Sequence, residues 1–429
     1  MKALWSIALR SAWNRRGTLG LVVLSIALAA FLLLSLERLR SDVRQSFSQS
    51  VSGTDLVVGA RTGSLQLMLY AVFRVGSATN TVTMASVQAL AEHPAVRWVL
   101  PIALGDSHRG FPVLGSTTEY FTRFQYGDRQ DLVLAQGRAF AGTLDGLYET
   151  VLGAEVAERL GYRLGDRLTL SHGSSGVIQG GALAAEHADK PFTVVGVLAR
   201  TGTPVDRTLH VSLEAIEALH LDWVGGAPMP GVRIAPEQAR KFDLAPKQVT
   251  AALVGLKSRV AVFKVQRFVA DYQAEPLMAV LPGVALDELW AVVGVGERAL
   301  LAMSGLVALV SLAGLVAVVL AGLNERRREL AVLRAVGAGP RHVLWLLAIE
   351  GALVTGAGVL LGALATALAL VFAGPWVQQA FGITLQGGAP TGTQVGLLCA
   401  VWGAGMLSSL VPGWRAYRLS LADGLSPRS

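Results

Sequence analysis

Long uninterrupted runs of apolar residues occur near both ends of the chain. Residues 17–36 and residues 299–323 contain no charged side chain, and neither does the tract 351–414. Glycine and proline divide that last tract at GPW, 374–376, and at GGAP, 387–390. A helix needs about 20 mostly apolar residues to cross roughly 30 Å of hydrocarbon. The pattern therefore predicts four membrane-spanning helices, at 17–37, 299–323, 343–373 and 394–412.

The first apolar run has a second interpretation, because a basic tail precedes it as in a cleavable signal peptide. Its apolar core is too long for a signal peptide, and SLERLR follows at 35–40, where small residues would be needed for cleavage. We therefore interpret residues 17–37 as a retained membrane helix.

The segment 38–298 has a mixed pattern of short β-branched runs and helical periods, which predicts an α+β fold. Strands are predicted at TDLVVGA (54–60), VRWVLPIAL (96–104), RLTL (167–170) and FTVVGVLA (192–199). Helices are predicted at MASVQALAEH (84–93), GAEVAERLG (153–161), SLEAIEALH (212–220) and the long stretch 236–260. The Gly-rich stretch 172–190 is predicted to be a mobile hairpin tip or loop.

Composition agrees with a membrane protein, since 52% of the residues are hydrophobic and only 16% are charged. The net charge of +7 does not indicate a nucleic-acid partner, because many arginines gather at the ends of the apolar runs. The single cysteine, Cys399, excludes an intramolecular disulfide.

The distribution of Lys and Arg predicts the orientation in the membrane. The N-terminal tail has four such residues, the segment 324–342 has five and the tail after Pro412 has three, whereas 374–393 has none. Both termini and 324–342 are thus expected in the cytoplasm of a multi-pass protein of the cell inner membrane. The predicted divisions are 1–16 cytoplasmic, 17–37 helix, 38–298 extracytoplasmic domain, 299–323 helix, 324–342 cytoplasmic, 343–373 helix, 374–393 external loop, 394–412 helix and 413–429 cytoplasmic.

The charged segment after the second predicted helix has the pattern of an exposed amphipathic helix. Leu330, Leu333 and Val336 recur at helical spacing among arginines, and GAGP at 337–340 ends the pattern. A signal that only fixes orientation would need about three basic residues and no apolar stripe. We therefore interpret the segment as a docking surface for a partner protein.

A family resemblance rests on this segment. ERRRELAVLRAVGAGPRHVLWLLAIEG resembles the signature of the MacB/FtsX/LolC-type ABC transporter permeases, and TVVGVLARTGTPVDRTLHVSLEAIE resembles part of their periplasmic domain. VPGWRAYRLSLADGL resembles the family's closing motif, with Ser420 where the family often has proline. The resemblance implies a type VII permease subunit that forms a dimer with a second copy or a paralogue. It also implies contact with a cytoplasmic ABC ATPase through the residues Glu325, Arg326, Glu329, Leu330, Leu333, Arg334, Gly337 and Ala338.

No phosphate-binding loop G-x-x-x-x-G-K-[ST] occurs in the sequence. ATP and Mg are therefore expected on the partner ATPase, and this chain is expected to be no enzyme and to hold no cofactor. Motifs of zinc proteases, redox dithiols and serine hydrolases are absent as well. Six of the seven histidines are scattered over 38–298 without ligand spacing, so no metal site is expected.

Two further sets of residues are candidates for contacts. Gly358 and Gly362 form a G-x-x-x-G step, which would pack helices closely either within one subunit or between two. The run SLQLMLYAVFRV, 64–75, is interpreted either as part of the domain core or as an exposed loop that contacts lipid or an acylated substrate. In the second case the contacting residues would be Leu65, Leu67, Met68 and Phe73.

The predicted function is that of a permease that uses ATP hydrolysis by its partner to move its periplasmic domain. This movement would export or extract a lipoprotein, a peptide or a small amphiphile, with a periplasmic adaptor or lipoprotein as a further partner. Two alternatives remain open: an FtsX-like regulator of cell-wall hydrolases, and a membrane-anchored sensor, for which the cytoplasmic segments are short.

Overall fold

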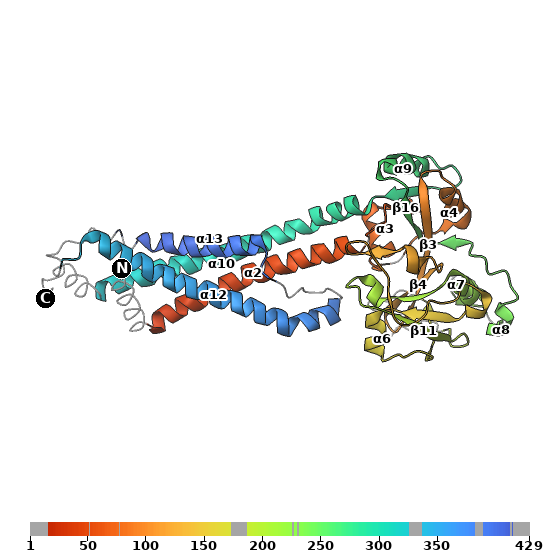
Figure 1. Ribbon diagram of the computed structural model, residues 1–429, viewed down its shortest axis with the longest axis horizontal. Coiled ribbons are helices and arrows are strands. Elements are labelled where there is room, and N and C mark those ends of the chain that lie inside the picture. The colour runs from red at the N-terminus through yellow and green to blue at the C-terminus, as the bar shows by residue number, and fades with distance from the viewer. Residues whose placement is uncertain are drawn as a thin grey trace. The chain divides into compact units, whose positions relative to one another are not determined.

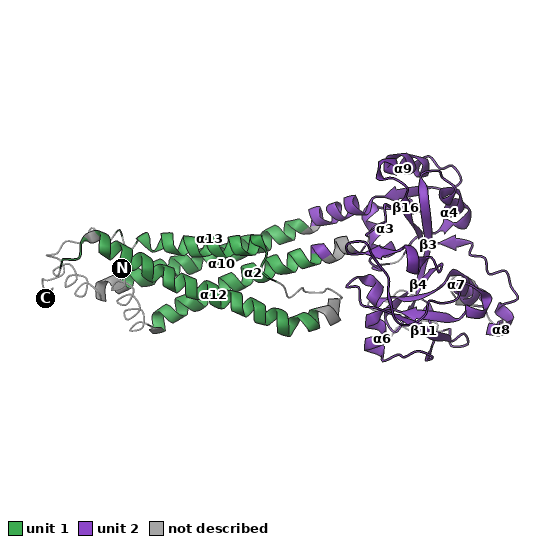
Figure 2. Ribbon diagram, in the orientation of Figure 1, with its two compact units in different colours: residues 1–43, 293–429 green, residues 44–292 purple. Residues whose placement is uncertain are grey.

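The computed structural model describes residues 16–50, 52–76, 78–172, 187–224, 227–229, 231–325, 337–381, 389–411 and 414. The chain divides into two compact units, one formed by residues 1–43 with 293–429 and the other by residues 44–292 (Figure 1, Figure 2). The first unit is helical, and the second is built around a β-sheet.

Long helices form the first unit. They are α2 (Arg16–Gln49), α10 (Pro282–Glu325), α12 (Pro340–Phe381) and α13 (Gly392–Ser408). Within the described residues, three stretches are long and apolar enough to cross a membrane, Gly17–Gln45, Gly294–Ala321 and Arg341–Val377. The fourth predicted span corresponds to α13, which has 17 residues.

The end of α12 differs from the sequence prediction. The GPW sequence was expected to end this helix at residue 373, but α12 continues through Pro375 to Phe381. Proline removes one hydrogen bond from a helix and bends it, yet apolar membrane helices tolerate it when neighbouring groups satisfy the backbone. The break predicted at GGAP, 387–390, is confirmed, because α13 begins only after Pro390. Thr391 and Gln394 form a capping box at the start of this helix.

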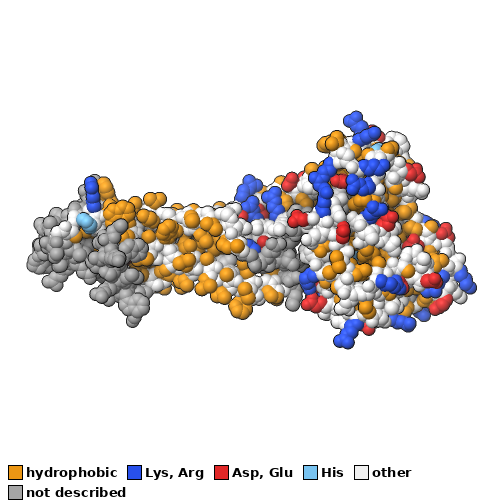
Figure 3. All heavy atoms as spheres, viewed as in Figure 1, with side chains coloured by type: hydrophobic (Ala, Val, Ile, Leu, Met, Phe, Trp, Pro, Cys, Tyr) orange, Lys and Arg blue, Asp and Glu red, His pale blue; other side chains and the backbone are white. Residues whose placement is uncertain are grey.

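Large apolar side chains point outward from these helices. Leu21, Leu309, Leu360 and Phe372 are 68%, 64%, 71% and 78% exposed, respectively. Hydrophobic side chains cover the helices in Figure 3, whereas Lys, Arg, Asp and Glu gather over the α+β unit. A helix surface of this kind is stable in lipid and unfavourable in water.

An eleven-stranded mixed sheet organises the described part of the second unit, with the main order β17-β1-β16-β3-β4-β12-β8-β11-β7. The strands are β1 (Leu56–Ala60), β3 (Val96–His108), β4 (Phe111–Ser116), β7 (Leu134–Gly137), β8 (Glu149–Leu152), β9 (Arg167–Leu168), β10 (Ser171–His172), β11 (Phe192–Leu198), β12 (Leu209–Ser212), β16 (Ala251–Leu256) and β17 (Leu277–Val280). Two pairs, β12 with β4 and β11 with β8, are parallel, and the other pairs are antiparallel. Short two-residue strands form three further pairs, β2 (Val82–Thr83) with β15 (Gln248–Val249), β5 (Gln125–Tyr126) with β6 (Gln130–Asp131), and β13 (Trp223–Val224) with β14 (Ala227–Pro228).

Short helices pack around the sheet (Figure 1). They are α3 (Ser64–Ala71), α4 (Met84–Ala91), α5 (Tyr120–Arg123), α6 (Ala154–Leu160), α7 (Leu213–His220), α8 (Pro236–Ala239) and α9 (Val262–Ala270). The strands predicted at 54–60, 96–104, 167–170 and 192–199 are confirmed in β1, β3, β9 and β11. The helices predicted at 84–93, 153–161 and 212–220 are confirmed in α4, α6 and α7.

The helix predicted over 236–260 is wrong, because only α8 is an α-helix there and β16 follows it. Strand β16 lies between β1 and β3, and all six of its residues are buried. Ala251 and Leu253 join one hydrophobic cluster, and Ala252 and Val254 join another. A strand buried on both faces shows no alternation of apolar and polar residues, so its periodicity does not distinguish it from a buried helix.

Candidate functional site

Two glycines of α12 provide a close contact with α2 inside the helical unit. A Cβ atom on Gly358 would lie 2.7 Å from Ile26 Cγ2, and one on Gly362 would lie 2.6 Å from the carbonyl oxygen of Ala27. Small residues at such positions let two helix backbones approach closely. The G-x-x-x-G step thus lies against a helix of the same chain.

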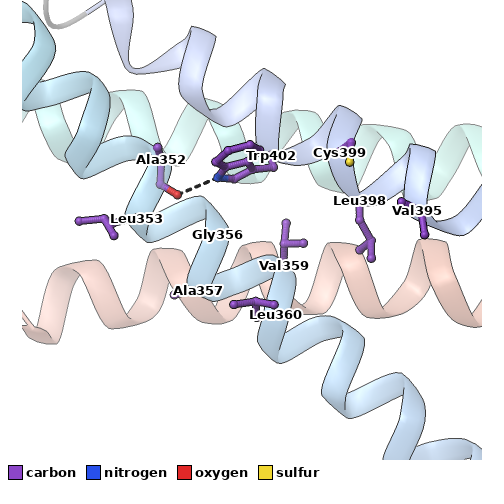
Figure 4. A pocket seen from close by; sticks show the side chains of 10 residues that line it. All are labelled: Ala352, Leu353, Gly356, Ala357, Val359, Leu360, Val395, Leu398, Cys399 and Trp402. Atoms are coloured by element: carbon purple, nitrogen blue, oxygen red, sulfur yellow. Dashed lines mark hydrogen bonds between the residues drawn. The ribbon is translucent and has the colours of Figure 1, made fainter. Parts of the chain in front are cut away.

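Helices α12 and α13 enclose an apolar groove of about 630 Å³ (Figure 4). Trp402 closes one side, and its indole Nε1 donates a hydrogen bond of 3.0 Å to the Ala352 carbonyl oxygen. The lining residues are Ala352, Leu353, Gly356, Ala357, Val359, Leu360, Val395, Leu398, Cys399 and Trp402. No charged side chain belongs to this lining, so the groove has the chemistry of a lipid-facing surface.

The charged connection between α10 and α12 contains the residues expected to contact an ATPase. The structure describes α10 as far as Glu325, and Pro340 is the first residue of α12, as the sequence predicts. Gly337 has φ +101°, a value that residues with a Cβ rarely adopt, and Ala338 follows it outside any helix. Arg326, Glu329, Leu330, Leu333 and Arg334 lie outside the described residues.

The apolar run 64–75 begins with helix α3, which packs in the core of the α+β unit. Leu67, Met68 and Phe73 are buried, with 0%, 1% and 8% exposure, and Leu65 is partly exposed. The alternative of an exposed loop that contacts lipid or substrate is therefore wrong for these three buried residues. The sequence could not separate the two interpretations, because an apolar run has the same composition in a core and in a contact surface.

A cluster of ionisable side chains in the α+β unit was not expected from the sequence. Asp106, His172, His187 and His220 each offer a nitrogen or oxygen atom, and these four atoms all lie within 4.8 Å of one another. Strand β10 pairs with β3 so that His172 lies opposite Asp106, and His220 is the last residue of α7. The expectation that the histidines are scattered is thus wrong for three of them.

Hydrogen bonds and burial set the charges of this cluster. Burial by itself would raise the pKa of Asp106, but the hydrogen bond with His172 and the nearby imidazole of His220 lower it to about 2. Burial lowers the pKa of His187 to about 4. Partial burial acts to lower the pKa of His220, but attraction to Asp106 outweighs it and raises the pKa.

Only a weak signal in the sequence points to the cluster. His172 and His187 flank the Gly-rich stretch that was interpreted as a loop, and the structure describes both ends of it but not residues 173–186. His172 contacts Asp106 because β10 pairs with β3, a contact over 66 residues that no local pattern reveals.

Comparison with known proteins gives matches along most of the chain. Residues 17–266 match the family described as MacB-like periplasmic core domain, and residues 301–421 match the family described as FtsX-like permease C-terminal. No curated protein matches.

Two solved structures are similar to part of the chain. One is the periplasmic region of MacB from Actinobacillus actinomycetemcomitans, with 13% identity and a TM-score of 0.34, covering 56% of this chain and 94% of that chain. The other is the extracellular domain of the noncanonic ABC-type transporter YknZ from Gram-positive bacteria, with 14% identity and a TM-score of 0.31, covering 53% of this chain and 99% of that chain.

The two family matches follow one another along the chain in the order that the sequence resemblance implies. The MacB-like match alone covers more than half of the 429 residues. The apolar surfaces of α2, α10 and α12 agree with it, because they are those of a membrane protein. The chain belongs to the MacB/FtsX-type permeases, the membrane subunits of ABC transporters whose ATPase is a separate protein.

Proposed function

We propose that this permease transmits ATP-driven motion of a cytoplasmic ATPase to its α+β unit on the other side of the inner membrane. The motion would export or extract a substrate that is periplasmic or held in the membrane. A second copy or a paralogue completes the transporter, and α13 serves as the fourth spanning helix, which places both termini in the cytoplasm.

The observation that carries this proposal is the continuity of α10. One uninterrupted helix contains residues of the α+β unit from Pro282 onward, the apolar stretch Gly294–Ala321, and Glu325 at the charged connection. A continuous helix transmits an axial displacement between its ends, whereas an interrupted helix absorbs it. Helix α2 has the same property, since it runs from Arg16 to Gln49.

An ion pair supports joint movement of the two helices inside the helical unit. Arg40 Nε of α2 donates a hydrogen bond of 2.9 Å to Glu297 Oε2 of α10, and Arg40 also contacts Glu37 at 3.3 Å. Both side chains of the longer-range pair are partly exposed, so its contribution to stability is modest. The ion pair between Arg40 and Glu297 instead holds α2 and α10 in one axial register.

The continuity of α10 can be tested with Val295→Pro, and Val295→Ala is the matched control. Val295 is 62% exposed, so the substitution acts through the backbone and not through lost packing. The complex with the cognate ATPase would be purified, and ATP turnover would be measured together with limited proteolysis of the α+β unit under ATP and under ADP. We expect a nucleotide-dependent cleavage pattern for wild type and for Val295→Ala, and turnover without that dependence for Val295→Pro. A nucleotide-dependent pattern in Val295→Pro would contradict transmission through α10.

The contact with the ATPase can be tested at Leu333. Leu333→Asp would place an unpaired charge in the apolar stripe of a desolvated interface, a loss of about 2–5 kcal/mol. Arg327→Ala, on the polar side of the stripe, is expected to cost less than about 1 kcal/mol. Co-purification with the ATPase would measure both. If Leu333→Asp assembles normally and its ATP turnover is unchanged, the segment is only an orientation signal.

A further inference from the structure

The side chains of Asp106, His172, His187 and His220 converge inside the α+β unit. Asp106 is 5% exposed and His187 is 1% exposed. His172 Nδ1 lies 3.0 Å from Asp106 Oδ1, His220 Nε2 lies 3.6 Å from the same oxygen, and the two ring nitrogens lie 3.1 Å apart. Donor atoms of a tetrahedral Zn²⁺ site, with bonds of about 2.0–2.1 Å, are separated by about 3.3 Å. The three separations among Asp106, His172 and His220 are close to this value, and the His187 ligand atom lies within 4.8 Å of the other three atoms.

Hydrogen bonding assigns the tautomer of His220. Its Nδ1 lies 2.8 Å from the carbonyl oxygen of Ile216, which can only accept, so Nδ1 carries a proton. In the neutral ring the lone pair is then on Nε2, which faces Asp106 and His172. A histidine that binds a metal through one nitrogen commonly donates its other N–H to a backbone carbonyl in this way.

His187 provides the second, independent observation. Neither of its ring nitrogens has a hydrogen-bond partner among the described residues, although the side chain is almost completely buried. A buried polar group without a partner is costly, about 1–3 kcal/mol for each lost hydrogen bond. Its ring lies beside Trp223, with the ring centroids 4.4 Å apart.

From this geometry we propose that Asp106, His172, His187 and His220 form a binding site for one divalent transition-metal ion of the Zn²⁺ class. Three imidazole nitrogens and one carboxylate oxygen give a closed four-ligand set, which suits a structural Zn²⁺ ion. The ion satisfies one ring nitrogen of His187 and links this residue to β3, β10 and the end of α7.

The surrounding charges permit a cation here. Lys190 is close in sequence to His187, but its Nζ lies 2.6 Å from Asp222 Oδ1, which compensates its charge. The carboxylate of Asp106 then offsets part of the charge of the ion. Asp106 and His187 are buried, and His172 and His220 are partly exposed, so an ion can reach the site from solvent.

The test uses the full chain purified in detergent with an affinity tag that lacks histidine, stripped with EDTA and dialysed against a metal-free buffer. Zn²⁺ is added, and stoichiometry is measured by titration calorimetry together with the thermal midpoint. Co²⁺ serves as a spectroscopic probe, because tetrahedral Co²⁺ absorbs intensely in the visible range. We expect one ion per chain, a higher midpoint with Zn²⁺ and a tetrahedral Co²⁺ spectrum.

Variants locate the ion. Asp106→Asn and His187→Phe are expected to weaken Zn²⁺ binding at least 100-fold and to abolish the rise of the thermal midpoint. His210→Phe removes a buried histidine of the same unit outside the cluster and is expected to bind Zn²⁺ like wild type.

Two outcomes would overturn the proposal: equal binding by Asp106→Asn and wild type, or wild type that shows neither a midpoint shift nor a tetrahedral Co²⁺ spectrum. The wild-type measurements decide the question even if both ligand variants fail to fold.

Discussion

Lys190 and Asp222 form a buried ion pair in the α+β unit, with Lys190 Nζ 2.6 Å from Asp222 Oδ1 and the Lys190 side chain fully inaccessible. Lys190 also donates to the carbonyl oxygen of Leu219 at 3.2 Å, and Asp222 Oδ2 accepts from the backbone N–H of Ile234. A buried pair of this kind need not add stability over apolar residues, but the removal of one partner leaves an uncompensated charge.

We predict that Lys190→Met destabilises the α+β unit by about 3–5 kcal/mol, because Asp222 then lacks its partner. For a unit of this size the thermal midpoint falls by roughly 6–20 °C. The double variant Lys190→Met/Asp222→Asn is the control, since it removes both charges and keeps an oxygen acceptor for Ile234. It is expected to recover most of the loss in a thermal scan of the purified chain. A double variant no more stable than the single one would show that charge is not the cause.

We predict that Gly362→Ala weakens the contact between α2 and α12. The new methyl group would lie 2.6 Å from both the carbonyl oxygen of Ala27 and the Cβ of Ala30, so the helices must separate. Such overpacking costs about 1–3 kcal/mol. Gly314→Ala is the matched control, because a Cβ there has no neighbour within 4 Å. A thermal scan in detergent should show a lower midpoint only for Gly362→Ala, and equal midpoints would exclude a tight contact at Gly362.

Acid is predicted to destabilise the α+β unit through His210. Burial, with a contribution from the charge of Arg74, lowers the pKa of His210 to about 3, whereas an unfolded histidine has a pKa of about 6.5. Between these two values the unfolded chain binds a proton that the folded chain does not, so stability falls as the pH falls from about 6.5 to 3. This single group contributes about 1.4 kcal/mol for each pH unit in that window.

His210→Phe removes the titrating ring and keeps its aromatic contacts with Tyr120 and Phe121. Thermal midpoints would be measured from pH 7 to pH 4. The midpoint of the variant should fall less steeply than that of wild type, and the difference between the two slopes should be about 3–6 °C per pH unit. Parallel curves would contradict a neutral His210 in the folded chain.

Topology gives a further prediction. In a Cys399→Ser background, a cysteine at Val260, which is 90% exposed in the α+β unit, should react with a membrane-impermeant thiol reagent in intact spheroplasts. A cysteine at Arg341, an exposed residue in the first turn of α12, should react only after permeabilisation. The reverse pattern would require the opposite orientation in the membrane.

The sequence predicts those parts of the fold that local patterns determine. β1 and β11 are β-branched runs with clear boundaries, and α2 and α10 contain apolar stretches of sufficient length. β16 was missed because both of its faces are buried, so the hydrophobic period that identifies a strand is absent. Gly255 in β16 also depends on a distant contact, since a Cβ there would lie 2.2 Å from the ring of Trp98.

Of the candidate sites, one could be recognised from the sequence and one could not. The charged connection after α10 could be recognised from sequence, because its charges and its Gly-Pro break are contiguous in the chain. The histidine cluster could not, because Asp106, His172 and His220 meet only after β10 has paired with β3 and α7 has packed nearby. Tertiary pairing, and not residue spacing, creates that group of ligands.

The position of β1 in the sheet has a consequence for biosynthesis. Leu56 pairs with Val254, and Val57 pairs with Val280, so the first strand of the sheet lies between two strands that are made about 200 residues later. Such non-local pairing slows folding, and an unpaired strand is prone to aggregation or proteolysis in the meantime. The first half of this unit therefore stays incomplete during synthesis until β17, which comes immediately before α10, has been made. A ribosome that stalls before residue 277 leaves β1 with an open edge, and quality-control proteases can recognise such an edge before the transporter assembles.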